Sequence, residues 1–289
     1  RISSFVAVSG AVAHRRAQPL PQQMLTSSST SESPLPLLCP AAAASSDCIL
    51  DALRTILRRE GEEGVRKLSS STASNSSALQ TGLRFAARYG NSSELWLEFG
   101  AWKGKSTRRI AVHHAVDSFD SFLGLPEDWR PSHRGGAADQ KAFAAKFLGR
   151  GAFSKQGQPP FNSTERLRWH VGWFNETLPP FLGRRPSQNV SFVHIDSDLY
   201  SSARTVLGLL APRLSPGAVL VFDELINYPE FRDGEYRALL ELQNETRRTV
   251  RVLGLSAARI LTDAHAMRTE IRQTGHELLA SQAVALQLL

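Results

Sequence analysis

Short apolar runs alternate with amphipathic segments along most of the chain from residue 94 onward. The apolar runs lie at 94–99, 115–119, 167–171, 190–196 and 218–223. Apolar residues at helical spacing follow most of these runs, at 105–114, 176–182 and 201–214. Strands that are apolar throughout and alternate with helices are buried on both faces, as in a parallel sheet. The pattern therefore predicts an α/β fold with a mostly parallel sheet and helices on both faces.

The regions around these alternating elements differ in composition. Residues 1–46 are rich in Ser, Ala and Pro, with one acidic residue, which predicts a disordered or targeting leader that resembles an organellar transit peptide. Residues 47–90 carry apolar residues at helical spacing and predict a helical prelude. The core domain is then expected over residues 91–270.

The end of the chain is predicted from its apolar residues. Runs at 250–255 and 258–262, separated by a short polar turn, predict a closing pair of strands. Residues 271–289 are apolar enough to predict a helical tail, docked on the body of the protein or on a partner. If the partner is a second copy of the chain, the protein is a homo-oligomer, and the sequence leaves this alternative open.

An insertion at residues 123–166 interrupts the alternation after the second strand. Its Pro, Gly and charged residues predict a lid over the active face, with a short helix at 139–147. We expect this lid to close over bound substrate and exclude water.

Composition excludes several classes of protein. Hydrophobic residues make up 42% of the chain and charged residues 21%, as in ordinary globular proteins. The net charge of +7 comes mostly from scattered Arg, and no basic run is interleaved with aromatics, so nucleic-acid binding is not expected. No apolar run approaches the roughly 18 residues of a membrane span. The two cysteines, Cys39 and Cys48, exclude a disulfide framework and a Cys-based zinc site.

Sequence motifs leave the compartment undecided. Six asparagines head N-x-[ST] sequons, the acceptor motif of N-glycosylation, and only Asn227 does not. The six are Asn75, Asn91, Asn162, Asn175, Asn189 and Asn244. A high Ser and Thr content generates such matches, yet they keep a secretory or Golgi route open beside the organellar one.

The stretch 94–107, ELWLEFGAWKGKST, indicates a ligand site. A predicted strand leads through a loop with Gly100 and Gly104 into a helix that opens with Ser106. In α/β folds this arrangement holds an adenosine-type ligand, because glycines let the backbone approach closely and N–H groups at the helix start face the ligand. Trp102 and Trp173 are candidates to stack on the adenine or close the pocket, although core packing is the usual role of Trp.

Two ligand classes compete for this loop. GAWKGKST is one residue shorter than a Walker A loop, and a phosphate cradle depends on that length because successive N–H groups must curl around one phosphate. Glu98, at the end of the strand, suits the cationic methyl donor S-adenosylmethionine and would repel a triphosphate. Asp120, followed by Ser121, ends the second strand, where a carboxylate accepts hydrogen bonds from ribose hydroxyls. We expect S-adenosylmethionine rather than ATP.

Acidic residues also follow two later strands. HIDSD supplies Asp196 and Asp198, and VFDE supplies Asp223 and Glu224. Carboxylates at the C-terminal ends of neighbouring parallel strands converge on one crevice, and their repulsion requires a cation, for which hard oxygen ligands favour Mg²⁺. Each strand end also fits a Walker B Asp, which keeps a P-loop-like nucleotide-binding protein as an alternative. His194 shares a strand face with Asp196 and is a core residue, a ligand or a base.

Over about residues 94–263 the chain resembles the macrocin O-methyltransferase family of S-adenosylmethionine-dependent enzymes. The motifs that carry the resemblance, in chain order, are LEFGAWKGKST, SFDSFLGLPEDW, VGWFNETLP, HIDSDLYSSARTVLGLLAPRLSPGAVLVFDE and DGEYRALLEL. The resemblance implies a Rossmann-like class I methyltransferase fold, a seven-stranded, mostly parallel sheet with an antiparallel last strand. It also implies Mg²⁺-assisted methylation of a small-molecule hydroxyl, often on a sugar attached to a natural product.

The resemblance also implies roles for individual residues. Glu98 and Gly100 line the cofactor, Asp120 takes the ribose, and the metal is held by Asp196, Asp223 and Glu224. Related catechol-type enzymes use a Lys base shortly after the first metal Asp, but DSDLYSS has none, so Asp198, His194 or a metal-bound acceptor hydroxyl is the candidate. The alternative from another class is an inactive methyltransferase-fold module that only binds a ligand or partner.

Overall fold

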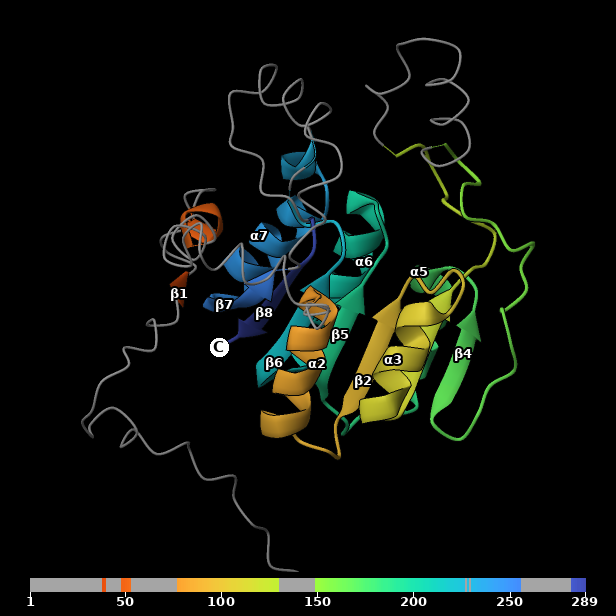
Figure 1. Cartoon of the computed structure of the whole chain (residues 1–289), viewed down its shortest axis with the longest axis horizontal. Helices are drawn as coiled ribbons and strands as arrows, with labels where there is room; N and C mark the ends of the chain where they lie inside the picture. The colour runs from red at the N-terminus through yellow and green to blue at the C-terminus, as the bar shows by residue number, and fades with distance from the viewer. Residues whose placement is uncertain are drawn as a thin grey trace, which may run out of the picture. The chain divides into compact units, whose positions relative to one another are not determined.

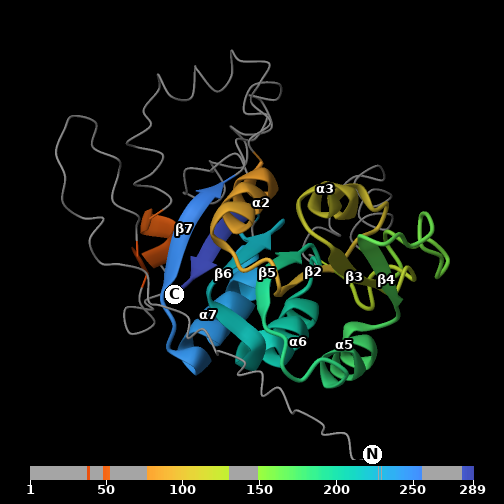
Figure 2. The ribbon, with the colours of Figure 1, turned by 90° about the horizontal axis from the view of Figure 1, so that it is seen from below.

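The structure is a computed structural model that describes residues 38–39, 48–52, 77–129, 149–226, 228, 230–255 and 282–289. These parts of the chain form one mixed sheet with helices on both of its faces (Figures 1 and 2). All structural statements below concern these residues.

The sheet has eight strands in the order β1-β7-β8-β6-β5-β2-β3-β4. The strands are β1 (Leu38–Cys39), β2 (Leu95–Phe99), β3 (Val116–Asp120), β4 (Leu167–Val171), β5 (Val190–Ile195), β6 (Leu214–Phe222), β7 (Val250–Leu255) and β8 (Val284–Leu288). Strands β2 to β6 pair in parallel, β8 runs antiparallel between β6 and β7, and β1 pairs antiparallel with β7. The chain proceeds outward from β2 to β4 and then crosses back to β5. The topological switch point, where such sheets bind ligands, therefore lies between β2 and β5.

The helices divide between the two faces of the sheet. They are α2 (Ala78–Tyr89), α3 (Lys105–His113), α5 (Phe174–Gly183), α6 (Tyr200–Leu210) and α7 (Glu235–Thr246), with short 3₁₀ turns η4 (Ala211–Arg213) and η5 (Phe231–Asp233). Figure 2 shows α2 and α3 on one face and α5, α6 and α7 on the other. None of the described helices combines the length and apolar character needed to cross a membrane.

Alternation along the central strands builds a core on each face. In β2, Trp96 packs with residues of α2 and α3, whereas Leu97 and Phe99 belong to the larger core beneath α5, α6 and α7. Successive side chains of a strand point to opposite faces, so an apolar strand supplies both cores. This explains why these strands are continuous apolar runs in the sequence.

The predicted fold class is confirmed, with one strand more than expected. The sheet is mostly parallel, and its last strand in the chain, β8, is antiparallel, as in the Rossmann-like class I methyltransferase fold. The additional strand is β1, which lies within the predicted leader of residues 1–46 and pairs with Arg251 and Val250 of β7. Two residues are too few to leave a periodic signal in the sequence.

The prediction of a helical tail over residues 271–289 is wrong for residues 284–288. These residues form β8, which is buried throughout and fills the space between β6 and β7. A short apolar run does not distinguish a buried strand from a buried helix, because both lack an exposed face. The core domain therefore extends past residue 270, and the partner of β7 is β8. The predicted strand at 258–262 lies outside the described residues, as does the predicted helix at 139–147.

One disulfide fastens β1 to the residues that follow it. Cys39 and Cys48 are joined, with their Cα atoms 5.7 Å apart, and residues 48–52 are helical. The buried amide of Gln243 in α7 donates to the Cys39 carbonyl at 3.0 Å. The two cysteines do not make a framework of several disulfides, but their pairing was not predicted from the sequence.

Candidate active site

A cavity of about 1040 Å³ opens at the C-terminal ends of the parallel strands, at the switch point between β2 and β5. Its walls come from the loop after β2, the ends of β3, β5 and β6, the starts of α5 and α6, and parts of the insertion after β3. The volume is at the upper end of the range that small-molecule and cofactor sites occupy.

Gly100 is required where the loop after β2 passes the loop after β5. Its φ of +87° lies in the left-handed region, and a Cβ atom there would overlap the carbonyl oxygen of Asp196. Gly104, with φ +68°, forms the N-cap of α3 and packs against Phe161 and Pro160 rather than lining the cavity. The two glycines therefore serve close backbone packing and the turn into the helix.

Asp120 organises the glycine loop. Its Oδ2 accepts hydrogen bonds from the backbone N–H groups of Ala101 at 2.8 Å and Trp102 at 2.9 Å, and its Oδ1 accepts from Phe122 at 2.7 Å. Asp120 also lines the cavity. Because each carboxylate oxygen has two lone pairs, one lone pair of Oδ1 remains for a predicted ribose hydroxyl.

Glu98 lies behind the cavity wall, although it was predicted to contact the cofactor. Its side chain is fully buried, and its Oε2 accepts from the Ser118 hydroxyl at 2.7 Å. Its Oε1 pairs with Nδ1 of His194 at 3.1 Å. Glu98 is opposite Ser118 on β3 and opposite His194 on β5, so strand pairing brings these three side chains together. Glu98 therefore acts on the site through His194.

His194 connects this buried pair to the cavity. The ring lines the cavity, and its Nε2 is buried without a hydrogen-bond partner among the described residues. A carboxylate at Nδ1 fixes the tautomer with the proton on Nδ1, so Nε2 carries a lone pair. His194 is thus placed as an acceptor of a hydrogen bond or of a proton from a ligand.

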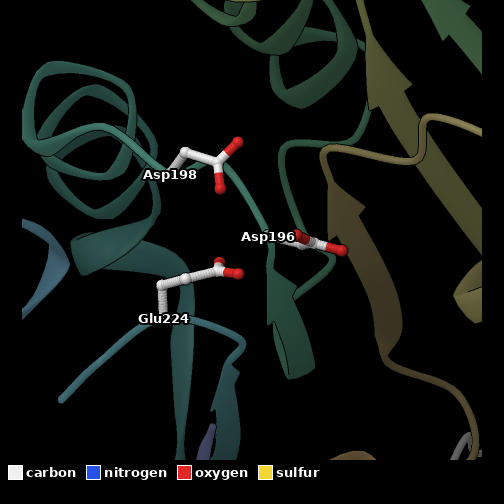
Figure 3. Close-up of side chains that lie close together, drawn as sticks. All are labelled: Asp196, Asp198 and Glu224. Atoms are coloured by element: carbon white, nitrogen blue, oxygen red, sulfur yellow. The ribbon is translucent and has the colours of Figure 1, made fainter. Parts of the chain in front are cut away.

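Three carboxylates converge where β5 and β6 end. One oxygen from each of Asp196, Asp198 and Glu224 lies within 4.8 Å of the others. Figure 3 shows Asp198 and Glu224 extending toward the space beside Asp196. Asp198 has φ +63°, and this left-handed turn directs the chain from β5 toward α6. Asp223, which was predicted as a metal ligand, lines the cavity but does not belong to this cluster.

The cluster is electrostatically unfavourable in the absence of a cation. Burial raises the pKa of Asp196 well above its usual range, and the negative charges of Asp223 and Asp198 raise it further. Burial likewise raises the pKa of Glu224, and the negative charges of Asp198 and Asp196 raise it further. Oε2 of Glu224 has no hydrogen-bond partner within the described part of the chain. Oxygen donors crowded in this way fit a hard divalent cation.

Glu235, at the start of α7, is a site residue that the sequence did not predict. It is fully buried, and its Oε1 accepts from the N–H and the hydroxyl of Ser197 at 3.2 and 3.0 Å. Burial and the charge of Asp198 raise the pKa of Glu235 to about 8, while the Ser197 hydrogen bonds act in the opposite direction. The motif DGEYRALLEL contains Glu235, but only the fold shows that it contacts the loop between Asp196 and Asp198.

Most residues that were predicted to contact the cofactor line the cavity. These are Gly100, Trp102, Ser106, Asp120, Ser121 and Trp173. Trp102 packs edge-on against Phe153 with ring centroids 5.3 Å apart, and the Lys103 ammonium lies 4.0 Å from its ring centroid. Trp102 is 39% exposed, so its ring is accessible to a ligand and is not part of the core.

The described flanks of the insertion form part of the cavity wall. Leu125 donates to Ala152 and Gly151 donates to Leu125, at 3.0 and 2.9 Å, which ties the two flanks together. Residues 123–126, 129, 150, 151 and 153 line the cavity. The described flanks of the insertion are therefore next to the cavity, while a lid over an active face and its closure over substrate stay predictions.

Part of the sequence matches a known protein family, and the match includes the residues that build this site. The sequence model of a family described as "Methyltransferase domain" matches residues 97–225, which run from β2 to the end of β6 and contain the glycine loop and all three clustered carboxylates. This match covers less than half of the chain, so it supports a methyltransferase domain over residues 97–225, and the narrower resemblance to the macrocin family stays a prediction.

Named relatives are O-methyltransferases. The chain is 30% identical over 145 residues to 8-demethyl-8-(2,3-dimethoxy-alpha-L-rhamnosyl)-tetracenomycin-C 4'-O-methyltransferase of Streptomyces olivaceus, covering 44% of this chain and 51% of that protein. It is 29% identical over 164 residues to demethyldecarbamoylnovobiocin O-methyltransferase of Streptomyces niveus, covering 52% and 60%. The chain thus spans only about half to three fifths of the length of these relatives.

The structure also has weak similarity to solved methyltransferases. Similarity to the calicheamicin methyltransferase CalS11 has a TM-score of 0.46 at 19% identity and covers 84% of this chain and 85% of that one. For the O-methyltransferase NovP the TM-score is 0.43 at 20% identity, covering 72% and 77%. At these scores the likeness adds nothing to what the strand order shows.

Proposed function

We propose that this protein is an S-adenosylmethionine-dependent, Mg²⁺-assisted O-methyltransferase that acts on a hydroxyl of a small molecule. The observation that carries the proposal is the convergence of Asp196, Asp198 and Glu224 beside the glycine loop, in one cavity at the switch point. An adenosine-type loop and a hard-cation site in the same cavity suit a reaction between a bound methyl donor and a metal-held oxygen.

The methyl donor is assigned to the half of the cavity formed by β2, β3 and the start of α3. Asp120 holds the loop in a fixed shape and retains one lone pair, on Oδ1, for a ribose hydroxyl. The exposed ring of Trp102 and the side chain of Trp173 offer apolar surfaces for the adenine. S-Adenosylmethionine, when bound, supplies an electrophilic methyl group on a sulfonium.

The acceptor is assigned to the half formed by the ends of β5 and β6. Asp196, Asp198 and Glu224 would hold Mg²⁺, which lowers the pKa of a bound acceptor hydroxyl. Asp223 lines the same half and would contact the acceptor or a metal-bound water. Because the cluster lies next to the glycine loop, the chain positions the acceptor oxygen beside the methyl donor, and positioning supplies much of the rate.

The proton of the acceptor hydroxyl needs a site on the protein. Nε2 of His194 carries a lone pair, lines the cavity and is held in place by Glu98. The Asp198 carboxylate is the second candidate, because the chain has no Lys shortly after Asp196. Transfer forms an oxygen–carbon bond, breaks the sulfur–carbon bond and leaves neutral S-adenosylhomocysteine.

The names of the relatives support a proposal for the acceptor class. The Streptomyces olivaceus enzyme is named for a 4'-oxygen of a rhamnosyl compound, and Mycinamicin III 3''-O-methyltransferase of Micromonospora griseorubida, 27% identical over 145 residues, is also named for an oxygen position. A hydroxyl of a sugar or of a natural-product glycoside is therefore the acceptor to test first. Vicinal hydroxyls would suit a cation that binds two acceptor oxygens.

Calorimetry with S-adenosylhomocysteine and with ATP, each with and without Mg²⁺, tests the class of the protein. We expect S-adenosylhomocysteine to bind in the micromolar range and ATP not to bind. Tight ATP binding that is lost in Lys105→Ala would instead support a P-loop-like protein. Binding of S-adenosylhomocysteine without methyl transfer to any glycoside in a panel would support an inactive binding module.

The metal set is tested by comparing Asp198→Asn with Asp223→Asn in a methyl-transfer assay. We expect EDTA to stop turnover and added Mg²⁺ to restore it. Asp198→Asn should lower the affinity for Mg²⁺ more than Asp223→Asn, because only Asp198 belongs to the cluster. Full activity in EDTA would remove the metal from the proposal, and the reverse order of the two variants would return Asp223 to the ligand set.

A further inference from the structure

The asparagines of this chain are distributed in a way that the proposed catalytic function does not explain. Six of the seven Asn residues head N-x-[ST] sequons. Ser and Thr together account for 46 of the 289 residues, about one in six. Random placement would therefore give about one sequon among seven asparagines, so the Ser and Thr content does not account for six.

The structure places these asparagines on the surface. Asn75 lies outside the described residues, and each of the other five has an exposed side chain: Asn91, Asn162, Asn175, Asn189 and Asn244. An N-linked oligosaccharide is bulky and hydrophilic, so only an exposed Asn can carry one in a folded protein. All of the described sequons meet this condition.

Two of the sequons are exposed at all three positions. Asn91–Ser93 lies in the loop between α2 and β2, and Asn162–Thr164 lies in the loop before β4. Neither loop lines the candidate active site. Asn189 is followed by the buried Val190 and Ser191 of β5, and Asn244 lies within α7. Asn175 lines the active-site cavity, where an oligosaccharide would obstruct the entry of substrate.

The disulfide is an independent observation that indicates the same compartment. Cys39 and Cys48 form a disulfide that joins β1, at the edge of the sheet, to the helical residues 48–52. Such bonds form and persist in oxidising compartments such as the lumen of the secretory pathway, and are rare where glutathione keeps thiols reduced. N-glycosylation takes place in the same lumen.

We propose that Asn91 and Asn162 carry N-linked oligosaccharides, added in the oxidising lumen in which the Cys39–Cys48 disulfide forms. Neither modification depends on the methyltransferase proposal. The result would be a protein whose hydrophilic glycans project from two loops and leave the active-site cavity open.

The chemistry of both modifications balances with ordinary luminal reactants. The Asn amide nitrogen forms a bond to the anomeric carbon of a lipid-pyrophosphate-linked oligosaccharide. The carbon–oxygen bond to the pyrophosphate breaks, the lipid pyrophosphate leaves, and one amide proton is lost to the base of the transferase. The disulfide forms when the two thiols pass two electrons and two protons to a disulfide-bearing oxidoreductase, which becomes a dithiol.

The test uses the protein produced from its own full-length gene in the cells that make it. Digestion with a glycoamidase, which releases the oligosaccharide and leaves Asp in place of Asn, should lower the mass of the protein by two oligosaccharides or more. Peptide mass spectrometry should then find Asp at positions 91 and 162. Unmodified Asn91 and Asn162 in this protein would overturn the proposal.

Each sequon contains its own matched control. Ser93→Ala should abolish modification at Asn91, as Asn91→Gln does, while Ser92→Ala should leave it unchanged because the middle position of a sequon is free. In the second loop Thr164→Ala should abolish modification, and Ser163→Ala should not. Modification that persists in Ser93→Ala and Thr164→Ala would show that the sequons are not its cause and would overturn the assignment.

Discussion

One buried carboxylate of this sheet, Asp117, and the cluster of Asp196, Asp198 and Glu224 have opposite surroundings. Asp117, in β3, receives hydrogen bonds from Nε and Nη2 of Arg168, both at 2.9 Å, and pairs with His170 at 2.8 Å. Burial raises the pKa of Asp117, but the hydrogen bonds and charges of His170 and Arg168 outweigh it and hold the pKa at about 2. In the carboxylate cluster, by contrast, burial and neighbouring negative charges both raise the pKa of Asp196 and of Glu224.

The difference indicates what each group contributes. A buried carboxylate with cationic partners stabilises the fold, whereas buried carboxylates that face one another cost stability until a cation or a proton neutralises them. Groups with strongly raised pKa values in a cavity are more typical of functional sites than of structural ones. We therefore expect substitutions in the two groups to separate activity from stability.

The largest effect is expected for Asp196→Asn on turnover. Loss of the central carboxylate should reduce Mg²⁺-dependent methyl transfer by about 100-fold or more, as for the loss of a group that stabilises the transition state. Without metal, the free energy of unfolding should not fall, and should rise by up to about 1 kcal/mol, because repulsion in the cluster is relieved. Turnover with Mg²⁺ and urea unfolding with EDTA measure the two quantities.

The affinity for S-adenosylhomocysteine provides the control for this variant. The affinity of Asp196→Asn for S-adenosylhomocysteine should stay within a few-fold of the wild-type value, because the half of the cavity proposed for the cofactor is built by β2 and β3. A variant that loses activity, cofactor binding and stability together would contradict the assignment, since that outcome indicates general disruption of the site.

Asp117→Asn should have the reverse effect. The shift of the Asp117 pKa from 3.8 to about 2 corresponds to a contribution of about 2 kcal/mol at neutral pH. The variant should lose about this amount in urea unfolding. Its turnover should stay within a few-fold of wild type, because Asp117 does not line the cavity.

A double-mutant cycle with Arg168→Gln shows whether the loss comes from the ion pair. If the losses in the free energy of unfolding from the two substitutions are additive, the ion pair does not supply the stability. Asp117 would then not stabilise the fold through Arg168, as the comparison with the carboxylate cluster assumes.

The same carboxylate predicts an acid-dependent loss of stability. Its pKa in the folded protein, about 2, is lower than the ordinary value of 3.8, so the unfolded chain takes up the proton first as the pH falls. The contribution of Asp117 to the free energy of unfolding is complete above the pKa that this residue has in the unfolded chain. It disappears as the pH falls from about 4 to about 2. The stability difference between wild type and Asp117→Asn should therefore shrink from about 2 kcal/mol at pH 7 toward zero near pH 2. A difference that stays constant with pH would contradict the ion-pair explanation.

The succession of strands and helices along the chain, and the end of the parallel strands at which the cavity opens, could be predicted from the sequence, because they depend on local pattern and chain direction. Gly100, Asp120 and Asp196 line the cavity for that reason, and the roles predicted for them stay predictions. The partners of individual side chains could not be predicted. Glu98 lies one residue before the end of β2, and strand register places His194 and Ser118 opposite it, so that it is a buried residue that supports His194.

Other features depend on contacts between distant segments. The residues of β8 are apolar, as those of a buried helix would be. They form a strand because they pair with β6 and β7 on either side. Asp198 joins the metal candidates because of a left-handed turn at a non-glycine residue, which no sequence pattern marks. Glu235 reaches Ser197 across 38 residues of sequence.

The smallest of these effects is expected at Glu235, and two substitutions resolve it. Glu235 supports the loop between Asp196 and Asp198 through hydrogen bonds from Ser197, and its pKa of about 8 means that it is mostly protonated at neutral pH. Glu235→Gln keeps an oxygen for Ser197 and removes no charge that is present at pH 7, so turnover and stability should change little. Glu235→Ala leaves the buried Ser197 N–H without its acceptor, which should cost about 1 kcal/mol of stability and about tenfold in Mg²⁺-dependent turnover. Equal losses in both variants would show that the carboxylate acts by its charge, and Glu235 would then belong with the cluster rather than with the groups that position it.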